Sequence, residues 1–282
     1  MDYTLNCNGR LLHLDRPQVM GILNATPDSF YADSRRQTEQ EIAERTLQIL
    51  REGGSIVDVG ACSTRPSSTP ACEAEEMERL RTALTIVRRE APGAIISIDT
   101  FRPDVARMAV EEFGADIIND VGGTQCSTFN AQRSMFRMVS RLRVPYIYMS
   151  QQPTMKDVLL DCAEAVDALR SLGQKDIVLD PGFGFGKTLE QNYAVLDQLE
   201  RMQMTRLPVL VGVSRKSMVY RLLGCEPADA LNGTTALHAV ALMKGASILR
   251  VHDVREAVET VKLMAAMKSQ YTREGGADDG CR

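Results

Sequence analysis

Short apolar runs and amphipathic helical stretches alternate along almost the whole chain. Runs typical of buried strands occupy residues 19–23, 55–59, 95–98, 116–118, 144–148, 176–179, 208–211 and 247–251. Between them, apolar residues recur at helical spacing over 37–52, 73–90, 103–113, 128–141, 156–172, 189–203, 229–244 and 254–269, and 217–223 suits a further short helix. Nearly continuous apolar strands that alternate with helices are typical of a parallel sheet covered by helices. The pattern therefore predicts an α/β fold.

Eight such units predict a closed (β/α)8 TIM barrel over residues 17–269, a span close to the ~250 residues usual for this fold. A doubly wound open sheet shows the same alternation and is the structural alternative. We expect a single domain over 1–282, because no boundary interrupts the pattern. Residues 3–13 carry Asn8-Gly9 between two short runs, which predicts a β-hairpin before the barrel. The polar, glycine-rich end predicts a flexible tail over 270–282.

Polar side chains follow most of the predicted strands. The carboxyl ends of barrel strands meet at one rim, where such folds keep their chemistry, and the long connections at 24–36 and 60–72 lie on that side. The rim residues are Asn24; Ser63, Thr64 and Arg65; Asp99 and Thr100; Asn119 and Asp120; Met149 and Ser150; Asp180; Ser214, Arg215 and Lys216; and Arg250, His252 and Asp253.

A single polar residue after a strand often caps the next helix. We expect this of Asp253, and it is the alternative for Thr100. Asp99 and Asp180 each end an apolar strand without opening directly into a helix, which favours a site.

The glycine-rich segment 182–188, GFGFGKT, resembles two phosphate-binding motifs and matches neither. A P-loop requires glycine where Pro181 stands, and a dinucleotide-binding loop requires glycine where Lys187 stands. We interpret the glycines as allowing the backbone to approach a flat ligand, with Phe183 or Phe185 against it.

The remaining rim residues divide into two arcs of complementary chemistry. Asp180 and Lys216, on adjacent strands, can hold a planar heterocycle, since a carboxylate accepts paired N–H donors and an ammonium donates to a ring carbonyl. Arg65, Arg250 and His252 form a cationic arc suited to an anion such as a diphosphate. Asn24 can supply an oxygen to Mg2+, whose other ligands are commonly waters and substrate phosphates.

Composition narrows the class of protein. The net charge of −4 gives no basic footprint for nucleic acid. No apolar run is long enough for a membrane span, and the N-terminus has no signal pattern, so we expect a cytoplasmic protein without membrane or nucleic-acid partners. The 7 cysteines are an odd number without CxxC spacing, which argues against a disulfide framework or a zinc site.

Six segments spread over nearly the whole barrel form a recognisable set: MGILNATPDSF, IVDVGACSTRP, ISIDTFRPDVARMAVEEFGADIINDVGG, VLDPGFGFGKTLEQN, VLVGVSRKSM and ILRVHDVREAV. With these segments, in family order, the chain resembles the bacterial dihydropteroate synthases, the folate-pathway transferases inhibited by sulfonamides. The resemblance implies condensation of 6-hydroxymethyl-7,8-dihydropterin diphosphate with p-aminobenzoate to 7,8-dihydropteroate and pyrophosphate.

The resemblance also implies roles for individual residues. Asp99, Asn119, Asp180 and Lys216 would hold the pterin, and Arg250 would pack on its ring and meet the diphosphate with His252. The catalytic set is then Asp99, Lys216, Arg250 and His252. Asn24 would carry Mg2+ on the diphosphate. Further contacts are expected from Thr64 and Arg65 on the pterin diphosphate, and from Phe30, Pro66, Phe185, Ser214 and Lys216 on p-aminobenzoate. A homodimer through helices near 229–269 is also implied.

Three departures and two alternatives qualify this reading. Cys62 stands where the family has an acidic residue, Ser150 replaces a histidine, and the loop GGTQCSTFN after the fourth predicted strand lacks the common pattern, all of which concern the walls of the site. One alternative is a pterin-binding methyltransferase domain, which shares the barrel but has no need of a diphosphate arc. The other is a catalytically idle pterin-binding paralogue, against which the retained site residues argue.

Overall fold

The computed structural model describes residues 3–25, 35–62, 71–122 and 129–274. Its barrel strands are β3 (Gln18–Asn24), β4 (Ile56–Gly60), β5 (Ile95–Asp99), β6 (Ile117–Asp120), β7 (Tyr146–Met149), β8 (Ile177–Asp180), β9 (Leu210–Val211) and β10 (Ile248–Val251). All neighbouring pairs are parallel, in the order β8-β7-β6-β5-β4-β3-β10-β9. A parallel bridge between Leu179 and Val209 joins the two end strands, so the sheet closes. The predicted (β/α)8 barrel is confirmed.

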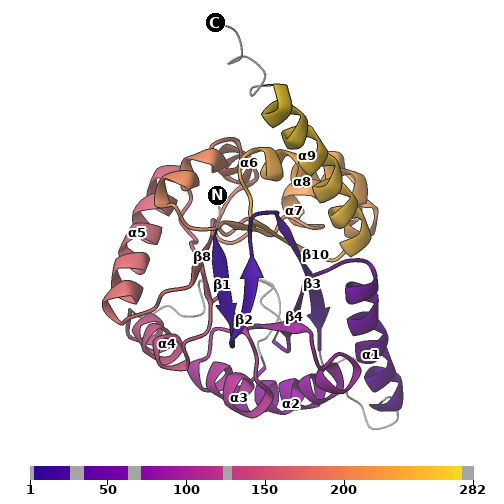
Figure 1. The fold of residues 1–282 in the computed structure, drawn as a ribbon, viewed down its shortest axis with the longest axis vertical. Coiled ribbons are helices and arrows are strands. Elements are labelled where there is room, and N and C mark those ends of the chain that lie inside the picture. Colours follow the sequence, from indigo (N-terminus) through magenta and orange to yellow (C-terminus); the bar gives the residue numbers. More distant parts are fainter. Residues whose placement is uncertain (1–2, 26–34, 63–70, 123–128, 275–282) are drawn as a thin grey trace, which may run out of the picture.

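Helices surround the strands as a ring (Figure 1). They are α1 (Arg35–Arg51), α2 (Glu73–Glu90), α3 (Pro103–Phe113), α4 (Phe129–Leu142), α5 (Met155–Ser171), α6 (Leu189–Asp197), α7 (Ser217–Leu223), α8 (Leu231–Met243) and α9 (Val254–Glu274), with short 3-10 helices η3 (Leu199–Thr205) and η4 (Pro227–Asp229). None of the helices within the described ranges is both long and apolar enough to cross a membrane.

Two helical predictions need correction. The stretch 189–203 is not one helix, since α6 ends at Asp197 and the 3-10 helix η3 follows. The buried residues of η3, Leu199 and Met202, are three positions apart, and a 3-10 helix with three residues per turn places both on one face. The last helix was predicted to end at 269, whereas α9 continues to Glu274, into the segment predicted as tail.

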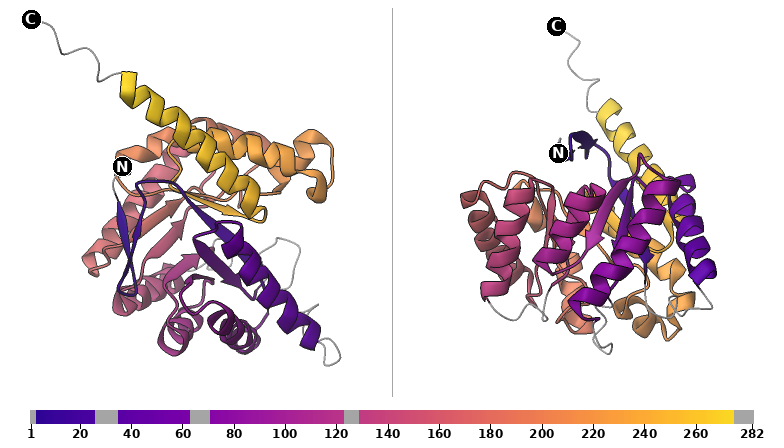
Figure 2. Two further views of the ribbon diagram at one scale, coloured as in Figure 1. Left: turned by 45° about the vertical axis from the view of Figure 1, so that its right-hand side comes forward. Right: turned by 90° about the horizontal axis from the view of Figure 1, so that it is seen from below.

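The predicted hairpin is present and closes the amino end of the barrel. β1 (Thr4–Cys7) pairs with β2 (Arg10–His13) through a turn in which Asn8 and Gly9 both have positive φ, as a tight hairpin turn requires. One face of the hairpin, with Leu5, Cys7 and Leu12, packs on the inward-facing strand residues in a buried cluster separate from the helix–sheet core. In Figure 2 the hairpin lies at one end of the barrel, away from the carboxyl ends of the strands.

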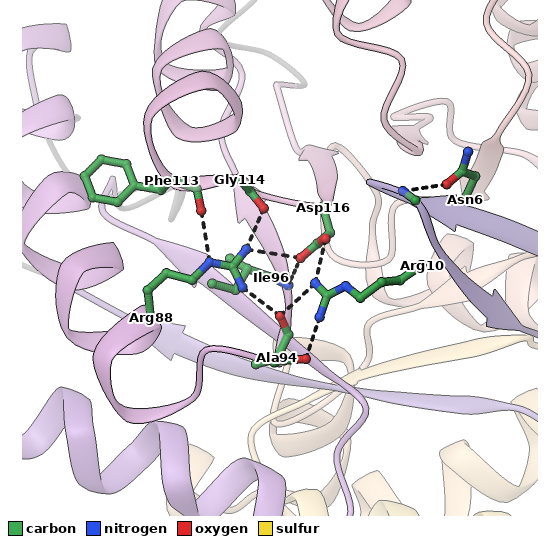
Figure 3. A network of polar contacts seen from close by, with 10 residues as sticks. Asn6, Arg10, Arg88, Ala94, Ile96, Phe113, Gly114 and Asp116 are labelled. Atoms are coloured by element: carbon green, nitrogen blue, oxygen red, sulfur yellow. Dashed lines mark hydrogen bonds and ion pairs between the residues drawn. The ribbon is translucent and has the colours of Figure 1, made fainter.

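A buried carboxylate fastens the hairpin to the barrel (Figure 3). Asp116, whose side chain is 1% exposed, accepts from Arg10 NH2 at 2.7 Å and from Arg88 NH2 at 3.3 Å, and also from the Ile96 N–H. Arg10 in turn donates to the Gly93 carbonyl at 2.5 Å. The hairpin, the end of α2 and the start of β5 therefore share one polar network, which leaves the opposite rim for chemistry.

Candidate active site

The pleat of each strand carries the polar residues into the barrel. Side chains two positions apart on a strand point to the same face. Ile56, Ile117, Val178 and Ile248 all belong to the cluster of side chains inside the barrel. The residues two positions towards the carboxyl end must therefore also point inward: Asp58, Asn119, Asp180 and Arg250. Ser97 and Asp99 follow Ile95 on β5 in the same way, and His252 follows Arg250.

These residues meet in a network centred on Arg250. Its Nε donates to Asp58 Oδ2 at 2.6 Å and its NH2 to Asp99 Oδ2 at 2.5 Å. Asn119 Nδ2 donates to the same Asp58 oxygen at 3.1 Å. Asp58 is 0% exposed and Arg250 17% exposed at the side chain. Four strands, β4, β5, β6 and β10, thus hold one guanidinium against two buried carboxylates.

Several buried acceptors in this network have no partner within the described residues. They are Asp58 Oδ1, Asp99 Oδ1, Asn119 Oδ1 and Ser97 Oγ. Buried polar atoms are nearly always hydrogen-bonded, so this concentration indicates a place where a ligand with N–H donors binds. Burial raises the pKa of Asp99, Arg250 opposes that rise, and the charge of Asp58 reinforces it. The cluster therefore holds a proton more readily than isolated carboxylates do.

The cationic arc predicted from the sequence is different in the structure. Arg250 is already paired with two carboxylates through Nε and NH2, so only part of its guanidinium is left for an anion. Burial and the nearby Arg250 lower the pKa of His252 to about 4, so its ring is neutral at neutral pH. His252 can still donate a hydrogen bond, but it adds no positive charge to this rim. The pairing of Arg250 is a tertiary effect, because its partners Asp58 and Asp99 lie on β4 and β5. Arg250 acts on His252, by contrast, from two positions away on the same segment.

Asp180, at the end of β8, and Lys216, after β9, both bind the backbone of the glycine-rich loop that follows β8. Asp180 Oδ1 accepts from the Gly182 N–H at 2.7 Å, and Lys216 Nζ donates to the Phe183 carbonyl at 2.5 Å. Burial lowers the pKa of Lys216 to about 8, against the effect of Asp180. Burial also raises the pKa of Asp180, which Lys216 opposes. The two groups influence each other electrostatically without a direct ion pair.

The glycines of the loop allow close approaches to neighbouring protein groups, whereas the predicted approach to a flat ligand stays a prediction. Gly182 has φ +71°, and a Cβ there would lie 2.0 Å from the Ser150 carbonyl oxygen. Gly184 has φ +81°, and its Cβ would lie 3.1 Å from Lys216 Cδ. Phe183 is fully buried in the core, whereas Phe185 is partly exposed with Lys216 Nζ 4.7 Å from its ring centroid. Of the two aromatic residues, Phe185 is the one available to a ligand.

The Lys187 side chain binds backbone carbonyls of this loop. Its Nζ donates to the Gly182 carbonyl at 3.0 Å, with longer contacts of 3.4 Å to the Ser150 and Phe185 carbonyls. Lys187 therefore organises the backbone near Asp180.

Two side-chain pairs join the ends of β9 and β10. Ser214 Oγ lies 3.1 Å from His252 Nδ1 and accepts from the His252 backbone N–H at 3.1 Å. Arg215 binds Asp253 through two bonds of 2.8 Å. Asp253 was expected to cap the last helix, and it stands directly before α9, where its backbone carbonyl accepts from the Ala257 N–H at 3.2 Å. Its side chain pairs with Arg215, since a guanidinium on the neighbouring strand end gives the carboxylate a bidentate partner.

Asn24 ends β3 with an exposed side chain, beside Gly60 of β4. No group of three or more His, Cys, Asp or Glu side chains that could hold a metal occurs in the described part of the chain. Four further predicted contact residues lie outside the described residues: Phe30, Thr64, Arg65 and Pro66.

Asp58 is the central residue that the sequence reasoning missed. The predicted site residues stand just after the strands, whereas Asp58 lies inside β4. The signal was nevertheless present, because a carboxylate within the apolar run SIVDV has to be buried and therefore needs a partner.

Comparisons with known proteins agree with this geometry. A family model described as pterin binding enzyme matches residues 20–252. The dihydropteroate synthase of Bacillus subtilis (strain 168) is 34% identical over 278 residues, covering 96% of this chain and 94% of that protein. The structure of the Xanthomonas albilineans dihydropteroate synthase with 4-aminobenzoic acid superposes with a TM-score of 0.86 at 34% identity, covering 95% of this chain and 99% of that one. The same enzyme in complex with 7,8-dihydropteroate gives 0.82 at 33% identity, with coverage of 95% and 99%.

Proposed function

Because this chain belongs to the dihydropteroate synthase family of pterin-binding enzymes, we propose that its barrel rim condenses 6-hydroxymethyl-7,8-dihydropterin diphosphate with p-aminobenzoate. The products are 7,8-dihydropteroate and pyrophosphate. One observation carries the assignment: buried acceptors without partners on β4, β5 and β6 surround a fixed guanidinium, beside a carboxylate and an ammonium on β8 and the end of β9.

The pterin ring fits this set of groups. Its amino and ring N–H donors match the free acceptor atoms of Asp99 and Asn119 and the carboxylate of Asp180. Lys216 supplies an ammonium for the ring carbonyl, held in place by the Phe183 carbonyl. A substrate that satisfies buried acceptors is strongly preferred over one that leaves them unpaired. The ring-binding residues therefore favour ligands whose N–H donors match these acceptors over ligands that lack them.

Arg250 is organised before the substrate arrives. A guanidinium has five N–H donors, and the bonds to Asp58 and Asp99 use one on Nε and one on NH2. NH1 makes no hydrogen bond to a described residue, so it is available to the diphosphate. Donors fixed in advance stabilise charge that develops as a bond breaks without a reorganisation cost.

The reaction then needs no covalent enzyme intermediate. The bond between the pterin methylene carbon and the diphosphate oxygen breaks, and its electron pair leaves with pyrophosphate. The amine nitrogen of p-aminobenzoate bonds to the methylene carbon and gives up one proton. Asp99, beside the ring, stabilises positive charge on the pterin, while Arg250 and the neutral ring of His252 donate to the leaving anion.

We propose that Mg2+ binds at Asn24. The side chain of Asn24 is exposed at the rim and makes no hydrogen bond to a described residue. One amide oxygen fits a metal whose other ligands are waters and phosphate oxygens. Bound there, Mg2+ would neutralise charge on the diphosphate. Calorimetry should show that Mg2+ strengthens pyrophosphate binding to the wild type and does so less for Asn24→Ala.

The p-aminobenzoate site is proposed beside Phe185 and Lys216, with Ser214 and, outside the described residues, Phe30 and Pro66. The stacked arrangement of Lys216 over the Phe185 ring would place an aromatic acid against an apolar face and near a cation. Sulfonamides, which resemble this substrate in shape, are expected to compete for the same place.

Pyrophosphate release tests the proposed function. The protein is mixed with the pterin diphosphate, Mg2+ and p-aminobenzoate, and pyrophosphate is followed against a control without p-aminobenzoate. Release that depends on the amine supports the synthase. Tight pterin binding without release would support the methyltransferase or idle-paralogue reading instead.

A homodimer is proposed through the last helices. Large apolar side chains are exposed on α7 (Leu222, Leu223), α8 (Met243) and α9 (Leu263, Met267), and α8 and α9 pack together (Figure 1). Sedimentation should show a dimer that Leu263→Lys weakens.

A cytoplasmic location is proposed because the cysteines are free thiols, among them Cys7, Cys62, Cys72, Cys162 and Cys225. Cell fractionation tests that location.

A further inference from the structure

Ser214 and His252 form a contact whose hydrogen positions can be worked out. Ser214 Oγ accepts from the backbone N–H of His252 at 3.1 Å and lies 3.1 Å from His252 Nδ1. Ser214 is 4% exposed, so its own O–H group needs a partner within the protein. Among the described residues, Nδ1 of His252 is the acceptor within reach. The hydroxyl therefore donates to Nδ1, which must carry a lone pair rather than a hydrogen.

The imidazole is neutral in this environment, so the position of its one hydrogen matters. Charged groups that act on the ring are Arg250, Asp253, Arg45 and Arg215, and burial together with Arg250 lowers the pKa of His252 to about 4. A neutral imidazole with a lone pair on Nδ1 carries its hydrogen on Nε2. Nε2 makes no hydrogen bond to a described residue.

The backbone around the pair is held in place. Arg215, next to Ser214, binds the carboxylate of Asp253, next to His252, through two bonds of 2.8 Å. Arg45 NH2 donates to the His252 carbonyl at 2.6 Å. These contacts fix the end of β9 against the end of β10, so the serine hydroxyl and the imidazole keep their register without a ligand.

We propose that Ser214 is a positioning residue that fixes the Nε2–H tautomer of His252, so that this rim presents a hydrogen-bond donor to the diphosphate. The other tautomer would present a lone pair, which repels a phosphate oxygen. This role differs from the contact with p-aminobenzoate expected from family resemblance. The link to the diphosphate rests on the proposed function, whereas the tautomer itself does not.

Nitrogen-15 NMR of histidine-labelled protein reads the tautomer directly. The chain has only 3 histidines, and His13→Gln and His238→Gln variants identify the signals of the other two. At neutral pH without ligand, His252 should show a protonated Nε2 and an unprotonated Nδ1. Ser214→Ala should shift both nitrogen signals towards a mixture of tautomers, and Ser214→Thr, which keeps the hydroxyl, should restore them. His13, whose Nδ1 lies 3.2 Å from Thr4 Oγ1 on the hairpin, is the internal control.

Kinetics test the consequence. Ser214→Ala should raise KM for the pterin diphosphate about tenfold, as expected for a lost hydrogen bond to a charged group. Its affinity for 6-hydroxymethyl-7,8-dihydropterin, which has neither the diphosphate nor the p-aminobenzoate part, should change less than about twofold on the same reasoning, and Ser214→Thr should recover the lower KM.

Three results would overturn the proposal: a wild-type His252 protonated on Nδ1, nitrogen signals unmoved by Ser214→Ala, or a KM increase confined to p-aminobenzoate. If the wild type releases no pyrophosphate, the proposed function fails, while the NMR result still decides what Ser214 does to His252.

Discussion

Arg250 and Asp58 show how single residues acquire their properties from neighbouring strands. One carboxylate oxygen of Asp58 accepts from both Arg250 and Asn119. Breaking a buried ion pair by removing one partner is costly, because the other charge stays buried without compensation. The pair therefore acts as a unit, and substitutions at either end should affect substrate use as well as stability.

Asp58→Asn tests the charge while keeping the shape. The amide oxygen can still accept from Arg250, but the negative charge that raises the pKa of Asp99 is gone. The pKa of Asp99 should fall, so the acidic limb of the kcat/KM profile for the pterin diphosphate should move to lower pH. We expect kcat/KM at its optimum to drop about tenfold, as for one charged hydrogen bond. Asp116→Asn, at the other end of the barrel, should leave the limb in place. An unmoved limb in Asp58→Asn would refute the coupling.

Arg250→Met removes the donors assigned to the diphosphate. We expect kcat/KM for the pterin diphosphate to fall about a hundredfold or more, since several charged hydrogen bonds are lost together. Arg255 is an exposed arginine on α9, and Arg255→Met should leave kcat/KM unchanged. Steady-state kinetics on both variants decide the matter, and equal activity would remove Arg250 from the mechanism.

At the scale of elements, the glycine-rich loop after β8 is positioned by backbone contacts rather than by side-chain packing alone. Gly182 passes so close to Ser150 that no side chain fits, and its N–H holds Asp180. The conformation of the loop therefore sets the place of a proposed pterin ligand.

Gly182→Ala should disturb both stability and activity. A methyl group would meet the Ser150 carbonyl and require a strained positive φ, so we expect a loss of about 3 kcal/mol or more. Gly173→Ala is the matched control, since Gly173 has φ +88° but open space around its Cβ position; it should cost only about 1 kcal/mol and leave kcat/KM intact. Calorimetric Tm and kinetics measure both. Equal losses in the two variants would show that the close contact is unimportant.

The packing of the hairpin can be tested by comparing a substitution at a buried leucine with one at an exposed leucine. Leu5 is 0% exposed inside the barrel end, whereas Leu11 on the paired strand is 63% exposed. Leu5→Ala should lower the free energy of unfolding by about 2–4 kcal/mol, and Leu11→Ala by less than about 0.5 kcal/mol. Urea unfolding compares them. Similar small values would mean that the barrel folds without its hairpin.

For the whole molecule, buried neutral histidine makes stability depend on pH. His238, on α8, is 2% exposed with Nε2 unpaired among the described residues, and burial lowers its pKa to about 4. The folded pKa lies below the unfolded value of about 6.5. Its contribution to stability is therefore fully present above pH 6.5 and is lost as pH falls towards 4.

His238→Leu should flatten that dependence. Between pH 8 and 4 the wild type should lose about 2–3 kcal/mol more of its unfolding free energy than the variant. His13→Leu, at an exposed position on the hairpin, should keep the wild-type change of unfolding free energy with pH. Urea unfolding across this pH range measures the difference, and parallel slopes for wild type and His238→Leu would contradict the assignment.

The sequence by itself determined the barrel and its hairpin. Alternating strands and helices and the Asn8-Gly9 turn are local patterns, and strand polarity follows from connection lengths, so these features needed no knowledge of contacts. It also brought Asp99, Asn119, Asp180 and Arg250 to one end of the barrel, because parallel strands deliver their carboxyl ends together. The charge on each group was not determined in this way.

Only the tertiary structure decided which groups pair. Asp58 binds Arg250 across 192 positions of sequence, Asp253 binds Arg215 of the neighbouring strand end, and burial leaves His252 neutral. Hydrogen bonds and desolvation depend on distances of a few ångströms between distant segments, and no local pattern encodes those distances. Periodicity sets where the chain turns and which side it buries, whereas electrostatics is settled when the strands meet.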